Sequence, residues 1–387
     1  MGTPARASNR HAPAGKTSPA GRPTTQLAWF PPTTGVNPYQ ELLYAALASF
    51  GIEAVEDATF DVQWLWRERR RVSFLHFHWR TDRYYDWPDD WICWHPPLVL
   101  RRVLVWVKLV SFMARLRLAR ALGYRLAWTV HDVYPKTPFG GRLHRAGARS
   151  LARSAHVLFA HDRATAERAR AELGSCVDGI RIVPHGSYVA YYPPGRPVAE
   201  VRAELGIDDG DFLFLYFGII RREKEVELLL DAFASLDRRD VALVVAGEVR
   251  DQRLDEVVRR AAVTDPRVRP LLSLVPEEGV AELFGACDAA VLPRSNGWTS
   301  GSLILALSLG LPVVAARVAA YEELVSEDAG WLFAPGDRDS LATTLAAAAA
   351  DRDVARAKGE AALRIAEGLS WLESAEATAA ALRDSRP

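Results

Sequence analysis

The run FLFLYFG at 212–218, a helical stretch at about 226–236 and the run VALVVAG at 241–247 follow one another in the sequence. Short, nearly wholly apolar runs of this kind are typical of strands buried on both faces, and a helix between two of them is typical of a βαβ unit. The same alternation continues on both sides of this stretch. The sequence therefore predicts an α/β fold built on parallel sheets.

The expected strands fall into two groups on either side of a stretch rich in Pro and Gly at 192–197, which we expect to be the domain boundary. The first group comprises 26–30, 52–55, 72–79, 125–130, 156–160 and 180–183, and the second comprises 212–218, 241–247, 268–272, 289–292, 313–315 and 330–333. We expect two Rossmann-like domains, at 26–195 and 196–366. A basic tail at 1–25 should be disordered, and a helix at 367–387, after a break near 368–371, should pack back toward the first domain.

Composition and charge restrict the possible classes of protein. The chain has 387 residues, 49% of them hydrophobic and 25% charged, which is ordinary for a globular protein and excludes disorder and fibres. Three cysteines without a C-x-x-C spacing fit a reducing cytoplasm. Residues 1–195 hold 26 Lys and Arg against 15 Asp and Glu, leaving 22 against 33 for the rest. The net charge is therefore +11 for residues 1–195 and −11 for the rest. A positive half suits an anionic partner, although the two oppositely charged halves could simply attract each other.

The segment between His78 and Tyr124 is rich in Trp and in cations. A helix at about 97–122 is expected there, and its apolar side chains are Leu98, Val105, Leu109, Phe112 and Leu116. That face either packs on the sheet, with the arginines reaching past it to water, or lies on an acidic membrane surface. Nucleic acid is the less favoured partner, because the Trp residues of this half are expected on an apolar face.

Polar residues follow several strands of the first domain, where loops converge at the crevice of a parallel sheet. They are His76, His78, Arg80, His131, Asp132 and His185. We expect His76 to point away from His78 and to be structural. Asp132 is the only carboxylate directly beside one of these histidines, and no H-x-x-x-H spacing occurs, so no metal site is expected.

Two features of the second domain suit a phosphorylated ligand. Arg221, Arg222 and Lys224 follow a strand and precede a helix, a position that suits a diphosphate if it is not merely a solvated turn. Residues 297–302 are small and precede an apolar helix, where they would let backbone amides approach a ligand or would only cap the helix. Neither a G-x-G-x-x-G after a strand nor a P-loop motif occurs.

The ordered segments FGIIRREKEVELLLDAF, VVAGE, PEEGVAELFGACDAAVLPRS, TSGSLILALSLGLPVVAA, YEELV and GWLFAPGD resemble the donor half of bacterial family 4 glycosyltransferases. GVNPYQELLYAAL, HFHW, TVHD and PHGSY are similar to segments of their exopolysaccharide and glycolipid branch. The resemblance covers about residues 26–380. It implies a GT-B fold, a nucleotide-diphosphate sugar held mainly by the second domain, an acceptor held by the first, and no metal or other cofactor.

The resemblance also assigns roles to residues. Arg221 and Lys224 match the phosphate-binding pair, and His131 matches a histidine near the transferred sugar. The other residues that it places around the donor are Gly35, Asn37, His185, Thr299, Ser300, Gly301, Ser302 and Glu323. The chain departs from the family pattern at Gly297 and Leu305, where two glutamates are usual, and Glu225 stands where glycine is common. Retaining chemistry is therefore not implied.

These observations predict transfer of a hexose from a nucleotide sugar, with GDP-mannose as the suggested donor, to a lipid-linked or oligosaccharide acceptor. The enzyme would be cytoplasmic and peripheral on the inner face of the plasma membrane. An inverting reaction needs a base beside the acceptor hydroxyl, and the candidates are His78, Asp86, His131 and Asp132. The loss of both glutamates leaves open a non-catalytic sensor or assembly scaffold. Sugar epimerisation or phosphorolysis by the same fold is a second, disfavoured enzyme hypothesis. A phosphorylase would need a pyridoxal lysine, and Lys224, the obvious candidate, is already assigned to phosphate.

Overall fold

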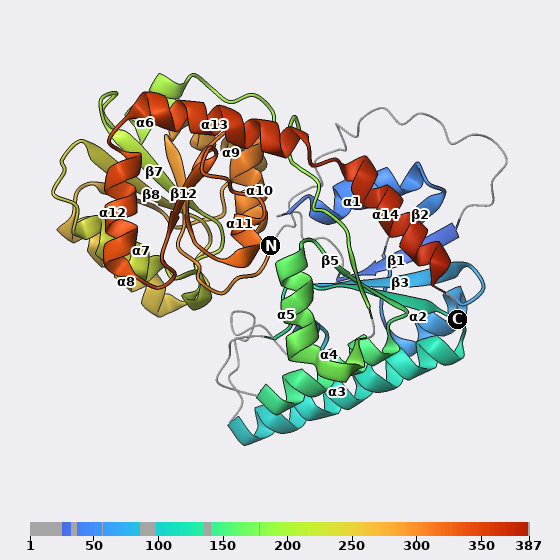
Figure 1. Ribbon diagram of the computed structural model, residues 1–387. Helices are drawn as coiled ribbons and strands as arrows, with labels where there is room; N and C mark the ends of the chain where they lie inside the picture. Colours follow the sequence, from blue (N-terminus) through green and yellow to red (C-terminus); the bar gives the residue numbers. More distant parts are fainter. Residues whose placement is uncertain are drawn as a thin grey trace, which may run out of the picture.

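The computed structural model describes residues 25–31, 37–55, 57–85, 98–134, 141–177 and 179–385. The predicted basic tail up to residue 24, Gly35 and Asp86 therefore lie outside the described residues. The described residues form two parallel six-stranded sheets, each covered by helices (Figure 1). This arrangement confirms the predicted fold class.

The first sheet has the strand order β2-β1-β3-β4-β5-β6. Its strands are β1 (Thr25–Phe30), β2 (Ile52–Val55), β3 (Val72–His78), β4 (Arg125–Thr129), β5 (Val157–Ala160) and β6 (Ile180–Ile182). The helices between them are α1 (Tyr39–Ala48), α2 (Val62–Glu68), α3 (Leu98–Ala121), α4 (Gly141–Ser154) and α5 (Arg163–Leu173). Every neighbouring pair of strands is parallel, so all six carboxyl ends lie at one edge.

The second sheet has the order β12-β11-β10-β7-β8-β9. Its strands are β7 (Phe212–Phe217), β8 (Val241–Ala246), β9 (Val268–Leu271), β10 (Ala289–Leu292), β11 (Val313–Ala316) and β12 (Gly330–Phe333). The helices are α6 (Val198–Glu204), α7 (Val226–Ala234), α8 (Gln252–Thr264), α9 (Glu277–Ala286), α10 (Gly301–Ser308), α11 (Ala319–Glu322), α12 (Arg338–Ala348) and α13 (Arg352–Glu367). Asp or Ser side chains accept hydrogen bonds from the first turns of α2, α5, α8, α12, α13 and α14.

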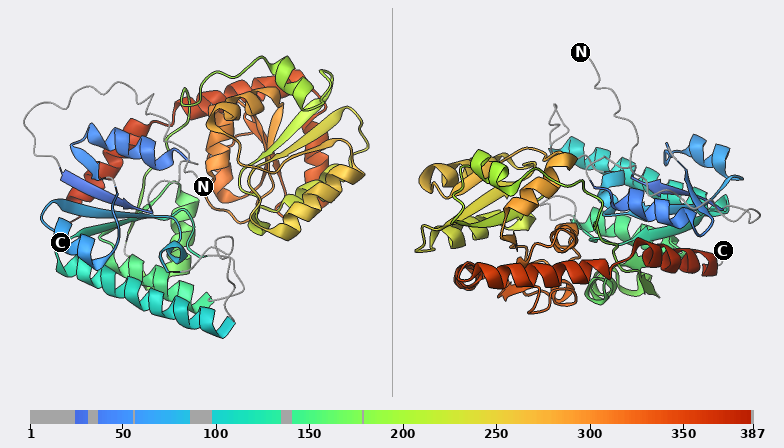
Figure 2. Two further views of the ribbon diagram at one scale, coloured as in Figure 1. Left: turned by 180° about the vertical axis from the view of Figure 1, so that it is seen from behind. Right: turned by 90° about the horizontal axis from the view of Figure 1, so that it is seen from above.

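The last helix, α14 (Trp371–Asp384), returns to the first sheet. It follows α13 after the predicted break at 368–370, and it packs on α1 (Figures 1 and 2). Ala375, Ala379 and Leu382 are buried with Leu43 and Leu47 of α1. The chain thus crosses between the two halves a second time, and α14 ties the end of the chain to the amino half.

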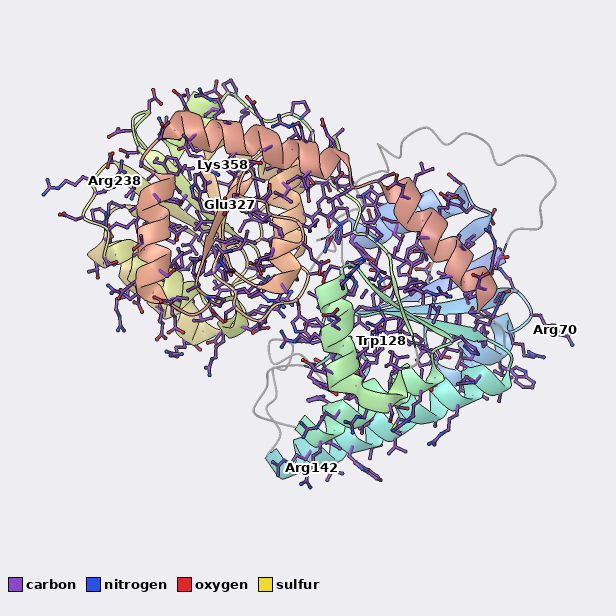
Figure 3. All side chains as sticks on the ribbon, viewed as in Figure 1. Arg70, Trp128, Arg142, Arg238, Glu327 and Lys358 are labelled. Atoms are coloured by element: carbon purple, nitrogen blue, oxygen red, sulfur yellow. The ribbon has the colours of Figure 1, made fainter. Side chains whose placement is uncertain are left out.

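Helix α3 covers the opposite face of the first sheet. Val105, Leu109, Phe112 and Leu116 are buried there, in the same core as Trp128 of β4, which lies in the interior of this half (Figure 3). Arg115 and Arg120 donate to backbone carbonyls at the edge of this face. The apolar row of α3 therefore packs on the sheet, which confirms the first of the two predicted interpretations. The second interpretation, in which this same row lies on a membrane, is wrong because the sheet covers it. The side chain of Leu98 lies outside the described residues.

Candidate functional site: a charged cleft between two sheets

The carboxyl ends of the two sheets face each other. Arg80 follows β3 and Asp132 follows β4, whereas Arg221, Glu223 and Lys224 follow β7. Glu223 acts electrostatically on Arg80, and Asp132 acts on both Arg221 and Lys224. Charged side chains from the two halves therefore meet across one cleft, at the position where open α/β sheets bind ligands.

The wall of the cleft formed by the second half carries more cations than anions. Arg221 lies 3.3 Å from Glu223, and its Nε has no hydrogen-bond partner among the described residues. Lys224 and Arg294, which follows β10, lie close to it. Arg222 differs, because its side chain is 71% exposed and reaches toward Asp251 at 3.9 Å. Arg221, Lys224 and Arg294 can neutralise a diphosphate, since guanidinium and ammonium groups pair with phosphate oxygens.

Lys224 has an unusual protonation equilibrium. Burial, together with the positive charges of Arg294 and Arg221, lowers its pKa to about 7. A bound diphosphate would place negative charge beside the ammonium and raise this pKa again. Binding should therefore take up about one proton at pH 8, and the affinity should fall as the pH rises above 7.

Isothermal titration calorimetry of UDP and GDP at pH 8, in buffers of different ionisation enthalpy, measures this proton uptake directly. Lys224→Arg is the matched control, because arginine stays protonated and should bind without uptake. Equal uptake by the wild type and Lys224→Arg would contradict the assignment of the proton to Lys224.

Asp132 is the acidic group on the opposite wall. Its carboxylate lies 4.0 Å from Arg80 Nε, and its side chain is 25% exposed. Asp82 is also close to Arg80, at 3.3 Å, but burial raises the pKa of that carboxyl. Asp132 is thus placed to accept a proton from a ligand in the cleft.

Beneath Asp132 lies a buried cluster of aromatic and imidazole rings centred on Tyr39. The Tyr39 ring lies 4.9–5.5 Å from the rings of His78, His131, His161, His185 and Trp371. Burial lowers the pKa of His78 and His131 well below the usual histidine value, and neighbouring histidines lower it further. The pKa of His185 falls to about 3 for the same reasons. These imidazoles are neutral at physiological pH, and their lowered pKa makes His78 and His131 weak proton acceptors.

The predicted orientation of His76 is wrong. Residues two apart in a strand share a face, and the rings of His76 and His78 lie 4.2 Å apart. The Tyr44 hydroxyl lies between them, 2.9 Å from His76 Nδ1 and 2.7 Å from His78 Nε2, and His76 Nε2 lies 2.8 Å from the Thr129 hydroxyl. Both histidines belong to one hydrogen-bonded network inside the first half.

The start of α10 brings most of the other predicted donor residues together. Asn37 accepts from the Tyr188 hydroxyl at 3.2 Å, and both side chains lie about 4 Å from the position of a Cβ at Gly301. The Ser302 hydroxyl faces Gly218, which ends β7. Ser300 is buried, and its hydroxyl lies beside the Tyr321 hydroxyl. A polar, close-packed wall therefore adjoins the cation cluster.

Thr299 and Glu323 lie in a contact between the two halves. Thr299 Oγ1 donates to Asp162, and it lies 2.9 Å from Thr165 Oγ1. The two carboxylate oxygens of Glu323 accept from the backbone N–H groups of Arg163 and Ala164, at 3.0 and 2.7 Å. Glu323 thus sits at the amino end of α5, where a negative charge is favoured. In this arrangement its two carboxylate oxygens are occupied by hydrogen bonds to the protein and are not free to bind a ligand in the cleft.

Sequence reasoning missed Arg294 and His161. Both directly follow a strand, β10 and β5 respectively, so the rule that selected His131 and Arg221 would also have found them. Tyr39 gave no such signal, because it begins a helix. Among the described residues, no group of three or more His, Cys, Asp or Glu side chains is arranged to hold a metal ion.

Two parallel α/β sheets whose carboxyl ends meet at a charged cleft define the GT-B class of glycosyltransferases. The solved structure of Anabaena HepE in complex with UDP and glucose superimposes with a TM-score of 0.68 at 16% identity, over 93% of this chain and 100% of that one. The structure of WaaG, a glycosyltransferase involved in lipopolysaccharide biosynthesis, gives a TM-score of 0.62 at 16% identity, over 92% and 98%.

Sequence comparison gives the family. Residues 211–351 match the model of the glycosyl transferases group 1. A GDP-mannose:glycolipid 4-beta-D-mannosyltransferase of Xanthomonas campestris is 26% identical over 83% of this chain and 82% of its own. A D-inositol 3-phosphate glycosyltransferase of Nocardia farcinica is 34% identical over 55% of this chain and 49% of its own. The chain is a group 1 (family 4) glycosyltransferase, an enzyme that transfers a sugar from a nucleotide sugar.

Proposed function

We propose that this enzyme moves a hexose from GDP-mannose to a lipid-linked acceptor, with inversion at the anomeric carbon. The observation that carries the reaction is the placement of Asp132 opposite Arg221 and Lys224 across one cleft. The donor would lie on the second domain, at 196–366, and the acceptor on the first, at 26–195. GDP-mannose is chosen because the Xanthomonas relative, which aligns along most of both chains, is named for it.

The reaction needs three events at the anomeric carbon. The acceptor oxygen forms a bond to this carbon, the bond to the diphosphate breaks, and the hydroxyl proton leaves. Arg221, Lys224 and Arg294 would neutralise the charge that develops on the departing diphosphate. Asp132 would take the proton, because it is a partly exposed carboxylate on the acceptor wall.

His131 would position groups around the reacting carbon rather than transfer the proton. Its ring stacks on Trp79, with centroids 5.3 Å apart, and its Nε2 lacks a partner among the described residues. A neutral imidazole there can hydrogen-bond a sugar or acceptor hydroxyl. Inversion of an α-linked donor would give a β-linked product, in agreement with the name of the Xanthomonas relative.

The donor is tested by thermal unfolding of the purified protein with UDP, GDP, ADP, dTDP and CDP. A ligand that binds only the folded state stabilises it by about 2.7 kcal/mol at 100 times its Kd. GDP is expected to raise the Tm most. A larger shift with UDP would overturn GDP-mannose as the donor, and the absence of any shift would overturn the donor site.

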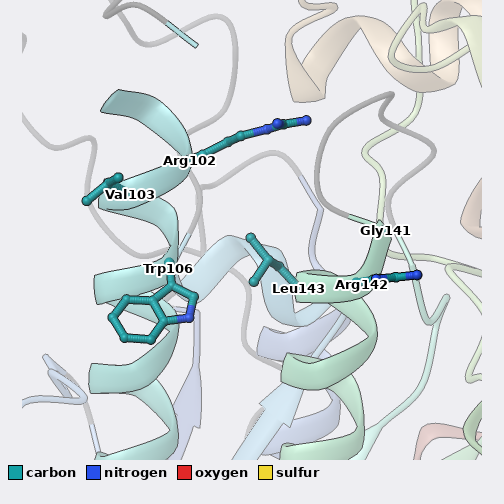
Figure 4. Close-up of a pocket in the computed structure, with 6 residues that line it drawn as sticks. All are labelled: Arg102, Val103, Trp106, Gly141, Arg142 and Leu143. Carbon is teal, nitrogen blue, oxygen red and sulfur yellow. The ribbon is translucent and has the colours of Figure 1, made fainter. Parts of the chain in front are cut away.

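The proposal of a lipid-linked acceptor is supported by an exposed apolar face of the first half, on α3 and the neighbouring α4. Outside the core, α3 exposes Val103, Trp106, Val107 and Val110, each at least 45% exposed. In Figure 4, Val103 and Trp106 lie beside Arg102 and opposite Gly141, Arg142 and Leu143 of α4, with an open groove between the helices. Asp132 is the only acidic residue between 98 and 161, so this face is cationic and apolar together.

Such a face suits the surface of an anionic bilayer, where apolar side chains enter the headgroup region and arginines pair with phosphates. None of the described helices combines the length and apolar character that crossing a bilayer requires. We therefore propose peripheral attachment, at the inner face of the plasma membrane, through the face formed by Val103, Trp106, Val107, Val110 and Arg142.

Binding to vesicles tests this attachment. The fraction of protein that cosediments should rise with phosphatidylglycerol content and fall with salt. Arg142→Ala is expected to weaken binding about fivefold, since one arginine near such a surface contributes about 1 kcal/mol, and Trp106→Ala should weaken it as well. Leu372→Ala is the control, because Leu372 is equally exposed but lies on α14. Binding that ignores acidic lipid, or equal effects of the Trp106 and Leu372 variants, would contradict the proposal.

A further inference from the structure

Glu225 has a backbone conformation that disfavours its side chain. It lies between Lys224 and the first residue of α7, with φ 56° and ψ 39° in the left-handed region. Residues other than glycine are uncommon there, and for most side chains the conformation costs stability. A glutamate at a position that suits glycine indicates that the side chain has a role which offsets this cost.

The carboxylate of Glu225 is held toward the loop that precedes α10. The Ser295 hydroxyl donates to its Oε1 at 2.5 Å. Both Glu225 and Arg294 lie close enough to the Tyr321 hydroxyl to affect its pKa. Because Lys224 comes immediately before it in the chain, this carboxylate lies beside the proposed phosphate site, where the sugar of the donor is attached.

Two buried hydroxyl groups lie next to each other near Glu225. Ser300 is 2% exposed and Tyr321 is 1% exposed, and the Ser300 hydroxyl lies within hydrogen-bonding reach of the Tyr321 hydroxyl. Apart from each other, the two hydroxyls have no hydrogen-bond partner in the described part of the chain. Glu225 also acts on the Tyr321 hydroxyl, so the three groups are neighbours. A pair of hydroxyls can use only one of its two hydrogens between its members, and a buried hydrogen left over is costly unless something else accepts it, which favours a polar ligand.

In this chain there is little room for a side chain at position 297, where the family usually has the first of its two glutamates. Gly297 has φ 66°, and a Cβ there would lie 3.3 Å from the Arg168 guanidinium of the first half. Arg168 itself lies over the Trp298 ring, with 4.6 Å between the guanidinium carbon and the ring centroid. A side chain at 297 would thus be strained and would meet a residue of the opposite half. Ser295, which holds Glu225, lies two residues earlier on the same loop.

We propose that Glu225, Ser300 and Tyr321 form the subsite that binds the hydroxyl groups of the donor sugar, and that Glu225 supplies the carboxylate missing at Gly297. This subsite rests on the proposed donor function. It binds a polyhydroxylated sugar, because an ionised carboxylate accepts two hydroxyl hydrogens and the two protein hydroxyls donate or accept as needed. Glu225 touches the sugar and takes no proton from the acceptor.

Calorimetry with paired ligands tests this subsite: GDP-mannose with GDP, and UDP-glucose with UDP. For the sugar nucleotide that the wild type binds, Glu225→Gln and Glu225→Gly should weaken binding about 10- to 100-fold, as expected for a lost hydrogen bond to a charged group. Binding of the matching nucleoside diphosphate should stay unchanged. Glu225→Gly should also raise the Tm by about 2–4 °C, because glycine relieves the left-handed conformation.

Glu227→Gln is the matched control, since Glu227 lies in the first turn of the same helix and pairs on the surface with Arg253. It should leave both ligands unaffected. An equal loss for sugar nucleotide and nucleoside diphosphate would assign Glu225 to the ribose and overturn the sugar subsite. Unchanged binding of both would overturn any contact with the donor. A wild type that binds none of the four ligands would instead overturn the proposed function.

Discussion

Replacing Arg221 by alanine is expected to lower kcat/KM for the nucleotide sugar by about 100- to 1,000-fold, as when one preorganised group that stabilises developing charge is removed. The reason is the position of Arg221, which is partly buried in the cleft, has an unpartnered Nε and lies 3.3 Å from Glu223. Bond cleavage leaves negative charge on the diphosphate, and Arg221 would be among the groups that stabilise it.

The measurement is a steady-state assay of nucleoside diphosphate release at several donor concentrations. Arg222→Ala is the control, because it removes the same side chain from the next residue, where the guanidinium is 71% exposed and points toward Asp251. It should change kcat/KM by less than about twofold, since exposed ion pairs contribute little. Equal losses in the two variants would remove Arg221 from the donor site.

Replacing Asp132 by asparagine is expected to lower kcat by about 100- to 10,000-fold while donor binding is retained, the range in which a general base contributes. Asparagine keeps the size of the side chain but cannot accept the proton. The Kd for the nucleoside diphosphate should even decrease slightly, because one negative charge near Arg221 and Lys224 is gone.

The kcat and the Kd of this variant must be measured together, by product formation and by calorimetry. Asp240→Asn serves as the control, since Asp240 precedes β8 at the end of the second sheet away from the cleft, and its exposed carboxylate pairs with Arg238. A kcat for Asp132→Asn within a few-fold of the wild type would contradict the role of Asp132 as base. Asp86, which lies outside the described residues, would then be the remaining carboxylate candidate for the base.

The order of strands and helices was predictable because each strand is a short apolar run that both faces of a sheet bury. FLFLYFG and VALVVAG are examples, and they form β7 and β8. The return of the last helix, now α14, to the first half was also expected. Its physical cause, the burial of Ala375 and Ala379 against α1, depends on contacts between distant segments, which periodicity does not reveal.

Side-chain surroundings were harder to predict than strand ends. Arg221 and Asp132 were found because they follow strands, and the structure places them across one cleft. Glu323 follows α11, the short helix after β11, yet its carboxylate accepts from the start of α5 in the other half. That contact depends on how the two sheets meet, a relation that local sequence does not encode. The exposed row of α3 was missed because the buried row beside it is also apolar.

The most direct test of sugar transfer is incubation of the enzyme with labelled GDP-mannose and bacterial lipid extract, followed by measurement of GDP and of label in the lipid phase. Our account predicts GDP and β-linked labelled lipid in equal amounts with the wild type, and neither with Arg221→Ala. If the wild type binds GDP-mannose but transfers label to neither lipid nor oligosaccharide, the account is contradicted, and a non-catalytic sugar-nucleotide sensor becomes the better description.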